Sequence, residues 1–194
     1  FTNHLAAKLA LQFVPDGTGD LQTTFGPEDI FHYMYAIFYA PTYRERYAEF
    51  LKIDFPRLPL TSNLELFRVL CAHGKRLVEL HLLEKVARGT TGFQGQGEYA
   101  VEKIEYVPKP NQPEMGCVWI NTTQYFEDVP AEIWAFHIGG YQVCQKWLKD
   151  RKGRALALAD LRDYQKIISA LSETITLMQH IDAAIDEHGG WPIA

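Results

Sequence analysis

The chain has 194 residues, of which 47% are hydrophobic and 13% aromatic, enough to bury a core in one large domain or two small lobes. Its formal net charge of -5 excludes a generally basic nucleic-acid coat, so any binding of phosphates has to come from a local patch. It contains no run of 18 apolar residues and no signal-peptide layout, so we expect no membrane partner and no export.

The three cysteines, Cys71, Cys117 and Cys144, are far apart in the sequence and lie in apolar surroundings without a CxxC pair. We expect buried thiols in a reducing cytoplasm. The chain begins at Phe1 rather than Met, which suggests a fragment of a longer polypeptide.

The first 26 residues predict an edge strand or a short helix followed by a loop, because two glycines interrupt the segment DGTGD. Pro27 suits the first turn of a helix that Pro41 stops, and the aromatic run between them predicts burial on most sides. Capping-box spacing at Thr42 predicts a second short helix to about Lys52.

The segment IDFPRLPL at 53–60 predicts an extended connector, because its two prolines exclude a helix. Capping-box spacing at Ser62 predicts a helix of about 25 residues.

The glycine-rich segment 88–97 then predicts a mobile loop. We reject a dinucleotide site there, since the fingerprint needs a strand before it and a helix after it, and the predicted order is the reverse.

Two segments rich in β-branched and aromatic residues, Tyr99–Val107 and Cys117–Asn121, predict an antiparallel pair joined by the loop PKPNQPEMG. A short helical turn after Pro130, a helix over Tyr141–Asp150 and a last helix capped by Asp160 follow. The expected fold class is α+β: several long helices packed with a small antiparallel sheet at about residues 98–126, helix-rich overall.

The stretch EIWAFHIGGYQVCQKWLKDRKGR, Glu132–Arg154, leads from an apolar anchor directly into a cationic face. One interpretation is a packed helix that ends in a solvated basic turn, where the helix dipole already favours cations. The other is a docked helix that offers its basic end to a polyanion such as DNA.

Catalytic and metal-binding patterns are missing from the sequence. The seven histidines form no HxH or HExxH box, and there is neither a GxSxG elbow nor a Walker-type GKS or GKT. We therefore expect no catalytic residues, no metal site and no bound cofactor in this chain.

Several stretches together resemble one family, the C-terminal specificity domain of Type ISP restriction-modification enzymes and related fused adenine methyltransferases. The resemblance covers about 27 to 182 and is carried by PEDIFHYMYAIFYAPTYRERYAEFLKIDFPRLPL (27–60), ELFRVLCAHGKRLVELHLLE (65–84), INTTQYFEDVPAEIWAFHIGGYQVCQKWLKDRKGRAL (120–156) and the following DYQKIISALSETITLMQHID.

The resemblance implies a target-recognition domain over 27–188, with 1–26 as a lead-in, that reads duplex DNA within a multifunctional cytoplasmic polypeptide of bacterial defence. It also implies an adenine-N6 methyltransferase and helicase and nuclease domains in cis, with S-adenosylmethionine, ATP and Mg²⁺ used upstream. The competing hypothesis is a non-catalytic helical scaffold or interdomain interaction module.

Residue roles follow from the chemistry of DNA, because phosphate contacts need Lys or Arg, whereas base reading needs polar side chains on loops or edges. The DNA-backbone candidates are Arg44, Arg46, Lys146, Lys149, Arg151, Lys152 and Arg154. The base-reading candidates are Gln94, Gln96, Asn121, Thr122, Gln124 and Tyr125. The residues from Asn121 to Gln124 also have an ordinary reading as turn formers, which stays open.

Overall fold

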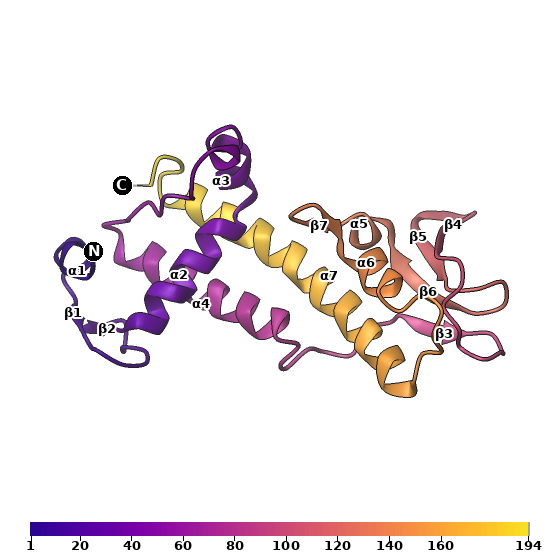
Figure 1. Ribbon diagram of the computed structural model, residues 1–194. Helices are drawn as coiled ribbons and strands as arrows, with labels where there is room; N and C mark the ends of the chain where they lie inside the picture. Colours follow the sequence, from indigo (N-terminus) through magenta and orange to yellow (C-terminus); the bar gives the residue numbers. More distant parts are fainter. Residues whose placement is uncertain (194) are drawn as a thin grey trace. The chain divides into compact units, whose positions relative to one another are not determined.

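Two units are formed by residues 1–193, the part of the chain that the computed structural model describes (Figure 1). The first unit contains residues 1–82 together with the C-terminal segment from Thr174, and the second is Leu83–Glu173. The helix α7 (Leu158–Glu187) contributes its first half to the second unit and its second half to the first.

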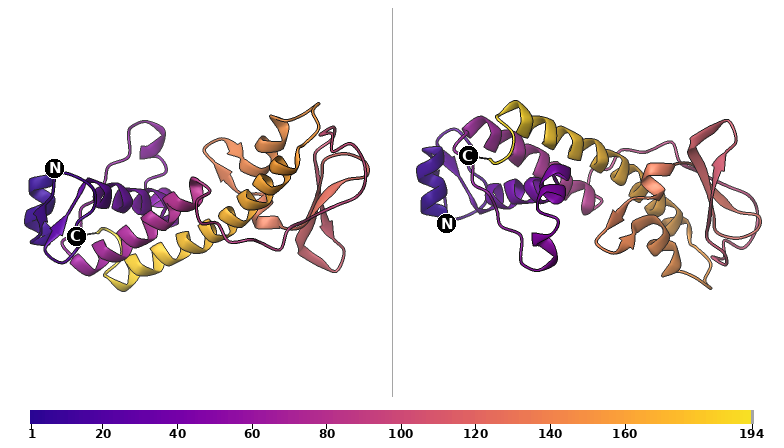
Figure 2. Two further views of the ribbon diagram at one scale, coloured as in Figure 1. Left: turned by 90° about the horizontal axis from the view of Figure 1, so that it is seen from below. Right: turned by 90° about the horizontal axis from the view of Figure 1, so that it is seen from above.

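The first unit is helical apart from one pair of very short strands. Its elements are α1 (Thr2–Leu9), β1 (Gln12–Phe13), β2 (Thr24–Phe25), α2 (Pro27–Tyr39), α3 (Pro41–Arg46), the 3-10 helix η1 (Phe50–Lys52) and α4 (Leu64–His81). The strands β1 and β2 are parallel, and α2 and α4 pack side by side (Figure 2).

Aromatic side chains from distant segments form the core of the first unit. The Phe67 ring of α4 lies 5.1 Å from Tyr33 of α2 and 6.2 Å from Phe25 of β2, and all three side chains are fully buried. A Cβ atom on Gly74 would lie 1.8 Å from the carbonyl oxygen of His32, so glycine is required where α4 packs against His32 of α2.

Helix ends in the first unit differ from the sequence prediction. Residues 42–52 do not form one helix: α3 ends at Arg46, and η1 follows as a separate turn. The helix expected from Ser62 over about 25 residues has 18, and its N-cap is Asn63, whose side chain accepts N–H groups of the first turn. The capping residues predicted this helix correctly but placed its N-cap one residue too early. Asn63 caps the helix in place of Ser62, because both residue types are good N-caps.

The second unit contains a four-stranded antiparallel sheet with strand order β3-β6-β5-β4. Its elements are β3 (Gly92–Gln94), β4 (Glu105–Lys109), β5 (Gln112–Trp119), β6 (Tyr125–Pro130), α5 (Ala131–Trp134), β7 (His137–Ile138), β8 (Tyr141–Gln142) and α6 (Val143–Lys149). Phe126 of β6 packs against Tyr164 of α7 with ring centroids 4.4 Å apart, which places the sheet core against the first half of α7.

The predicted pairing of two strands in the region 98–126 is confirmed, but the sheet is larger and its strands end elsewhere. PKPNQPEMG is mostly strand, because β4 continues to Lys109 and β5 begins at Gln112. The pairing of β5 with β6 begins at Met115, after Pro113. Proline lacks a backbone N–H, but no hydrogen bond to β6 is lost at this position, so β5 can contain it. Part of the predicted glycine-rich loop is β3, which pairs with β6.

Two further predictions for this unit are corrected. The predicted helix over Tyr141–Asp150 begins at Val143, because Tyr141 pairs with Ile138 in a small hairpin. Asp160 is not the residue preceding the last helix, which starts at Leu158; instead its carboxylate reaches back to the N–H of Ala157.

The expected α+β, helix-rich class is confirmed. Cys71 and Cys144 are buried free thiols as expected, whereas Cys117 is half-buried. Burial raises the pKa of the Cys144 thiol to about 12. Of the helices formed by residues 1–193, none has the length and apolarity needed to cross a membrane.

Candidate nucleic-acid interface

The basic segment, residues 146–154, starts on α6 and continues through the turn that follows it. Cys144 and Leu148 are fully buried on one side of α6, and the Trp147 ring lies 5.1 Å from Tyr164 of α7. The apolar face of α6 is therefore held in the core of the second unit, and its basic face stays on the surface.

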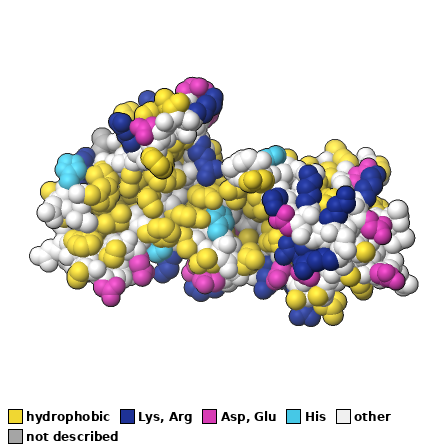
Figure 3. Space-filling view, in the orientation of Figure 1, with side chains coloured by type: hydrophobic (Ala, Val, Ile, Leu, Met, Phe, Trp, Pro, Cys, Tyr) yellow, Lys and Arg dark blue, Asp and Glu magenta, His cyan; other side chains and the backbone are white. Residues whose placement is uncertain are grey.

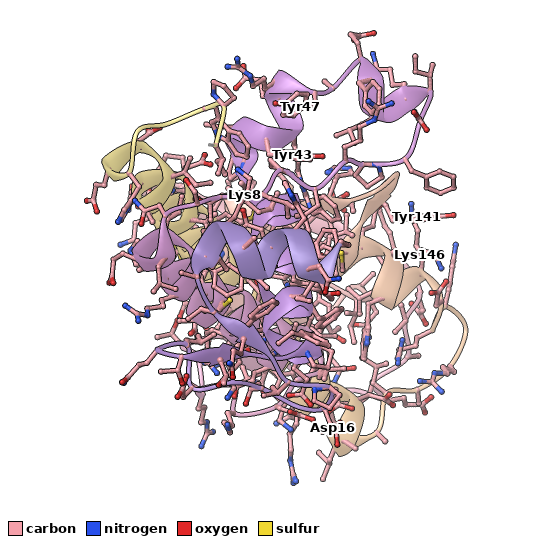
Figure 4. All side chains as sticks on the ribbon, turned by 90° about the vertical axis from the view of Figure 1, so that its left-hand side faces the viewer. Lys8, Asp16, Tyr43, Tyr47, Tyr141 and Lys146 are labelled. Atoms are coloured by element: carbon pink, nitrogen blue, oxygen red, sulfur yellow. The ribbon has the colours of Figure 1, made fainter. Side chains whose placement is uncertain are left out.

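The two lysines of α6 have weak local partners. Lys146 pairs with Asp150, and its ammonium group lies 5.7 Å from the ring centroid of Tyr141 (Figure 4). Lys149 donates to the neutral side chain of Gln145 at 2.6 Å. Exposed pairs of this kind contribute little to stability, so both ammonium groups can exchange these partners for a ligand anion.

Arg151 and Arg154 are positioned by one carboxylate at the start of α7. The Arg151 guanidinium stacks 3.4 Å from the Trp147 ring centroid and donates to the Asp160 carboxylate at 3.4 Å. Arg154 donates to the same oxygen at 3.1 Å, and the N–H of Ala157 donates to the other at 2.9 Å. The N–H of Ala157, and after it the two guanidinium groups, lower the pKa of Asp160, so the carboxylate stays charged and holds the turn in place.

Positive charge is concentrated in one part of an acidic chain. Residues 146–166 contain seven Lys and Arg against three Asp and Glu, a net charge of +4. Lys152 is exposed and has no carboxylate within ion-pair distance among residues 1–193. Figure 3 shows Lys and Arg side chains gathered over the α6 region of the second unit.

The two remaining backbone candidates belong to the first unit. Arg44 is half-buried, donates to the Phe38 carbonyl at 2.6 Å and stacks 4.5 Å from the Tyr39 ring centroid, so its guanidinium has a structural role. Arg46 is exposed at the end of α3.

The loop 95–97 and the turn 121–124, both predicted to read bases, meet on the surface of the second unit. Pairing of β3 with β6 brings them together, and Gly95 packs against the turn with φ +93°. A Cβ atom there would lie 2.0 Å from the carbonyl oxygen of Thr123, so the contact requires glycine. Two polar segments far apart in the sequence thus form a single tip.

Two of the base-reading candidates hold this tip together from within. Asn121 accepts the N–H groups of Thr123 at 2.9 Å and Gln124 at 2.8 Å, as an Asx turn does. Gln124 is fully buried and accepts the N–H of Tyr99 at 2.8 Å. A base edge cannot reach a fully buried amide, so Gln124 is a structural residue of the turn in this conformation, as the alternative reading of the segment predicted.

The other base-reading candidates reach the surface. Gln96 and Thr122 are exposed, and Gln94 is exposed with its amide nitrogen bonded to Glu127, which leaves its oxygen available as an acceptor. Tyr125 is half-buried against Trp119, with ring centroids 4.3 Å apart.

The sequence prediction gave no role in ligand binding to four residues of the second unit, and it named one of them, Asp160, only as a helix cap. Asp160 organises the basic segment, and Arg88, Arg162 and Lys166 line a cavity in the same unit. The spacing of Arg162 and Lys166, four apart on a helix, was a usable signal for two cations on one face. In residues 1–193, no three His, Cys, Asp or Glu side chains converge as a metal site requires.

The family resemblance is confirmed by the family model of the Type ISP C-terminal specificity domain, which matches residues 1–180. The chain belongs to this family. The matched region begins at residue 1, so it includes the first 26 residues, which lay outside the resemblance read from the sequence. Comparison with curated protein sequences gives no match.

Solved structures with a similar fold include the following three. A cryo-EM structure of a DrdV–DNA complex has a TM-score of 0.66 at 20% identity and covers 92% of this chain and 19% of that one. The ATP-dependent Type ISP restriction-modification enzyme LlaBIII bound to DNA has a TM-score of 0.56 at 21% identity. The match covers 86% of this chain and 11% of that one. A nuclease-deletion mutant of the Type ISP enzyme LlaGI in complex with a DNA substrate mimic has a TM-score of 0.51 at 22% identity. The match covers 84% of this chain and 14% of that one. The chain thus spans a fifth or less of these proteins.

Proposed function

We propose that this chain recognises a target sequence in duplex DNA for a Type ISP restriction-modification enzyme. The observation that carries the proposal is the net charge of +4 in residues 146–166 of a chain that is acidic as a whole. Family membership and the DNA complexes of similar fold support the same function.

The proposed recognition divides into two tasks on the second unit. Lys149 and Lys152 hold DNA phosphates, because they are exposed and have no carboxylate within ion-pair distance among residues 1–193. Gln94, Gln96 and Thr122 contact base edges from the tip that the loop 95–97 and the turn 121–124 form. Arg151 and Arg154 contribute charge while Asp160 positions them.

The enzymatic steps belong, in this proposal, to other domains of a longer polypeptide. An adenine-N6 methyltransferase with S-adenosylmethionine, and a helicase and nuclease with ATP and Mg²⁺, act in cis on the DNA that this domain holds, in the cytoplasm.

The proposal is tested first by selecting sequences from a pool of random 30-base-pair duplexes with the purified chain. Sequencing the bound fraction should reveal an enriched motif, and Gln96→Ala with Thr122→Ala should relax the preference at one or two of its positions. Bound DNA without any enriched motif would reduce the function to non-specific binding. Absence of DNA binding even at low salt would favour the interdomain scaffold.

The phosphate contacts are tested by the salt dependence of binding. Lys149→Gln with Lys152→Gln should lower the slope of log Kobs against log salt concentration by about 2, since each phosphate contact contributes about 0.9. The matched control is Lys52→Gln with Arg57→Gln, which removes two exposed cations of the first unit. Equal slopes for the two double variants would contradict the assignment.

A further inference from the structure

A cavity of about 320 Å³ lies in the second unit, between the loop before β3 and the first half of α7. Its lining residues are Val86, Ala87, Arg88, Gly89, Thr91, Arg162, Gln165, Lys166 and Ser169. None of these belongs to the basic segment or to the tip described above, so the cavity is a separate feature of the surface.

Three cations converge on this cavity from two elements. Arg162 and Lys166 are four residues apart on α7, and Arg88 comes from the loop opposite them. All three are exposed, and no carboxylate lies within 4.0 Å of their charged groups among residues 1–193. Three like charges around one cavity repel each other, and an anion bound between them relieves that repulsion.

The loop is held against α7, so the cavity has defined walls. The Gln165 amide donates to the Thr91 carbonyl at 2.9 Å, and a Cβ atom on Gly89 would lie 2.3 Å from the Ser169 hydroxyl oxygen. The backbone N–H groups of residues 87–89, which line the cavity, make no hydrogen bond to any acceptor among residues 1–193. Val86 and Ala87 add an apolar wall.

We propose that this cavity binds one phosphate group of the DNA backbone, with the attached deoxyribose against Val86 and Ala87. Guanidinium groups match phosphate oxygens in paired hydrogen bonds, and free backbone N–H groups supply further donors. This inference rests on the proposed function and adds a backbone contact outside the basic segment. The contact requires that DNA extend from the basic segment to α7 at residues 162–166.

The first test uses dimethyl phosphate, a diester like the DNA backbone, and follows backbone amide signals by NMR at constant ionic strength. The amides of Gly89 and Thr90 should shift with dimethyl phosphate and not with chloride, and Arg162→Gln with Lys166→Gln should abolish the shift. Larger shifts with inorganic phosphate than with the diester would assign the cavity to a free phosphate and overturn the DNA contact. No shift with either probe would overturn the site itself, whether or not the chain binds DNA.

The second test measures duplex DNA binding by the same double variant. Its salt slope should fall by about 1, and its affinity at 0.1 M salt should weaken roughly tenfold for every sequence, as expected when one phosphate contact is lost. The Lys52→Gln with Arg57→Gln control should leave both values unchanged. If the wild type binds DNA and the variant keeps its slope, the cavity is not a DNA contact although the proposed function stands.

Discussion

Asp160 shows how one side chain can position several cationic ones. It accepts the N–H of Ala157, as a carboxylate in the first turn of a helix does, and its other oxygen meets Arg151 and Arg154. The start of α7 and the position of two cations thus depend on the same group. Its charge matters for both, because an uncharged side chain would lose the attraction to the guanidinium groups.

Asp160→Asn should lower the free energy of unfolding at neutral pH by about 1 kcal/mol, the usual size of a helix N-terminal contact. The pKa of Asp160 is lower in the folded chain than its ordinary value of 3.8, so its stabilisation is present above that value. The stabilisation is lost as the pH falls below 3.8 towards the folded pKa. Urea unfolding of wild type and variant should therefore differ at neutral pH and converge in acid.

Asp163→Asn serves as the control, since Asp163 is an exposed carboxylate one residue from the first turn of the same helix and has no ion-pair partner within residues 1–193. A loss of stability equal to that of Asp160→Asn would show that general charge near the helix start, rather than the contacts of Asp160, causes the effect.

Gln124 marks the limit of residue-level prediction. Asn, Thr and Gln in a row are equally suited to reading bases and to forming a turn. Burial decides between these roles, and the burial of Gln124 depends on contacts with residues about 25 positions earlier in the chain, including the N–H of Tyr99.

At the scale of elements, the tip of the second unit depends on the pairing of β3 with β6. Gly92 lies opposite Glu127, and Gln94 lies opposite Tyr125. This register carries the loop 95–97 onto the turn 121–124, where Gly95 fits without a side chain. The exposed candidates Gln94, Gln96 and Thr122 therefore lie on one surface as long as this contact holds.

Gly95→Ala should lower the free energy of unfolding by roughly 2–4 kcal/mol, because a positive φ disfavours alanine and the new methyl group meets the Thr123 carbonyl. Thermal and urea unfolding measure the loss. The same variant should broaden the DNA sequences selected from a random pool, since the two halves of the tip are pushed apart.

The matched control is Gly139→Ala. Gly139 also has a positive φ, of +59°, but no atom lies within 4 Å of the position of a Cβ atom. It should cost roughly 1–2 kcal/mol from the backbone conformation alone. Equal losses for the two variants would mean that the contact between loop and turn contributes nothing.

At the scale of the whole molecule, charge is divided unevenly between the two units. The first unit contains 8 Lys and Arg against 12 Asp and Glu, and the second contains 11 against 12, so their net charges are -4 and -1. Within the second unit, residues 146–166 are strongly positive. The acidity of the chain as a whole therefore does not oppose a DNA contact at that segment.

Hydrogen exchange with and without duplex DNA should locate the contact on one unit. We expect slower exchange at the loops 88–90, 95–97 and 121–123 and at the turn 150–155, because bound DNA excludes water from these backbone amides. Exchange in α3 and η1 of the first unit should stay the same. Protection confined to the first unit would contradict the assignment of the interface.

The amino-acid sequence by itself determined the helix-rich α+β class, the family and the position of the basic segment. These features are local: apolar spacing on α2, α4 and α7, capping residues, and five cations within nine positions from Lys146 to Arg154. The pairing of two strands was also readable, because β-branched and aromatic residues gather in them.

The tertiary structure decided which polar side chains are available to a ligand. Contacts between distant segments buried Gln124, held Arg151 and Arg154 on Asp160, placed Arg88 opposite Arg162, and assigned Arg44 to the packing of the first unit. No periodicity encodes such contacts, since they depend on strand register and on how loops close over helices. The basic segment was visible as charge in the sequence. The positions of Arg151 and Arg154, however, are set by Asp160 on the helix that begins at Leu158.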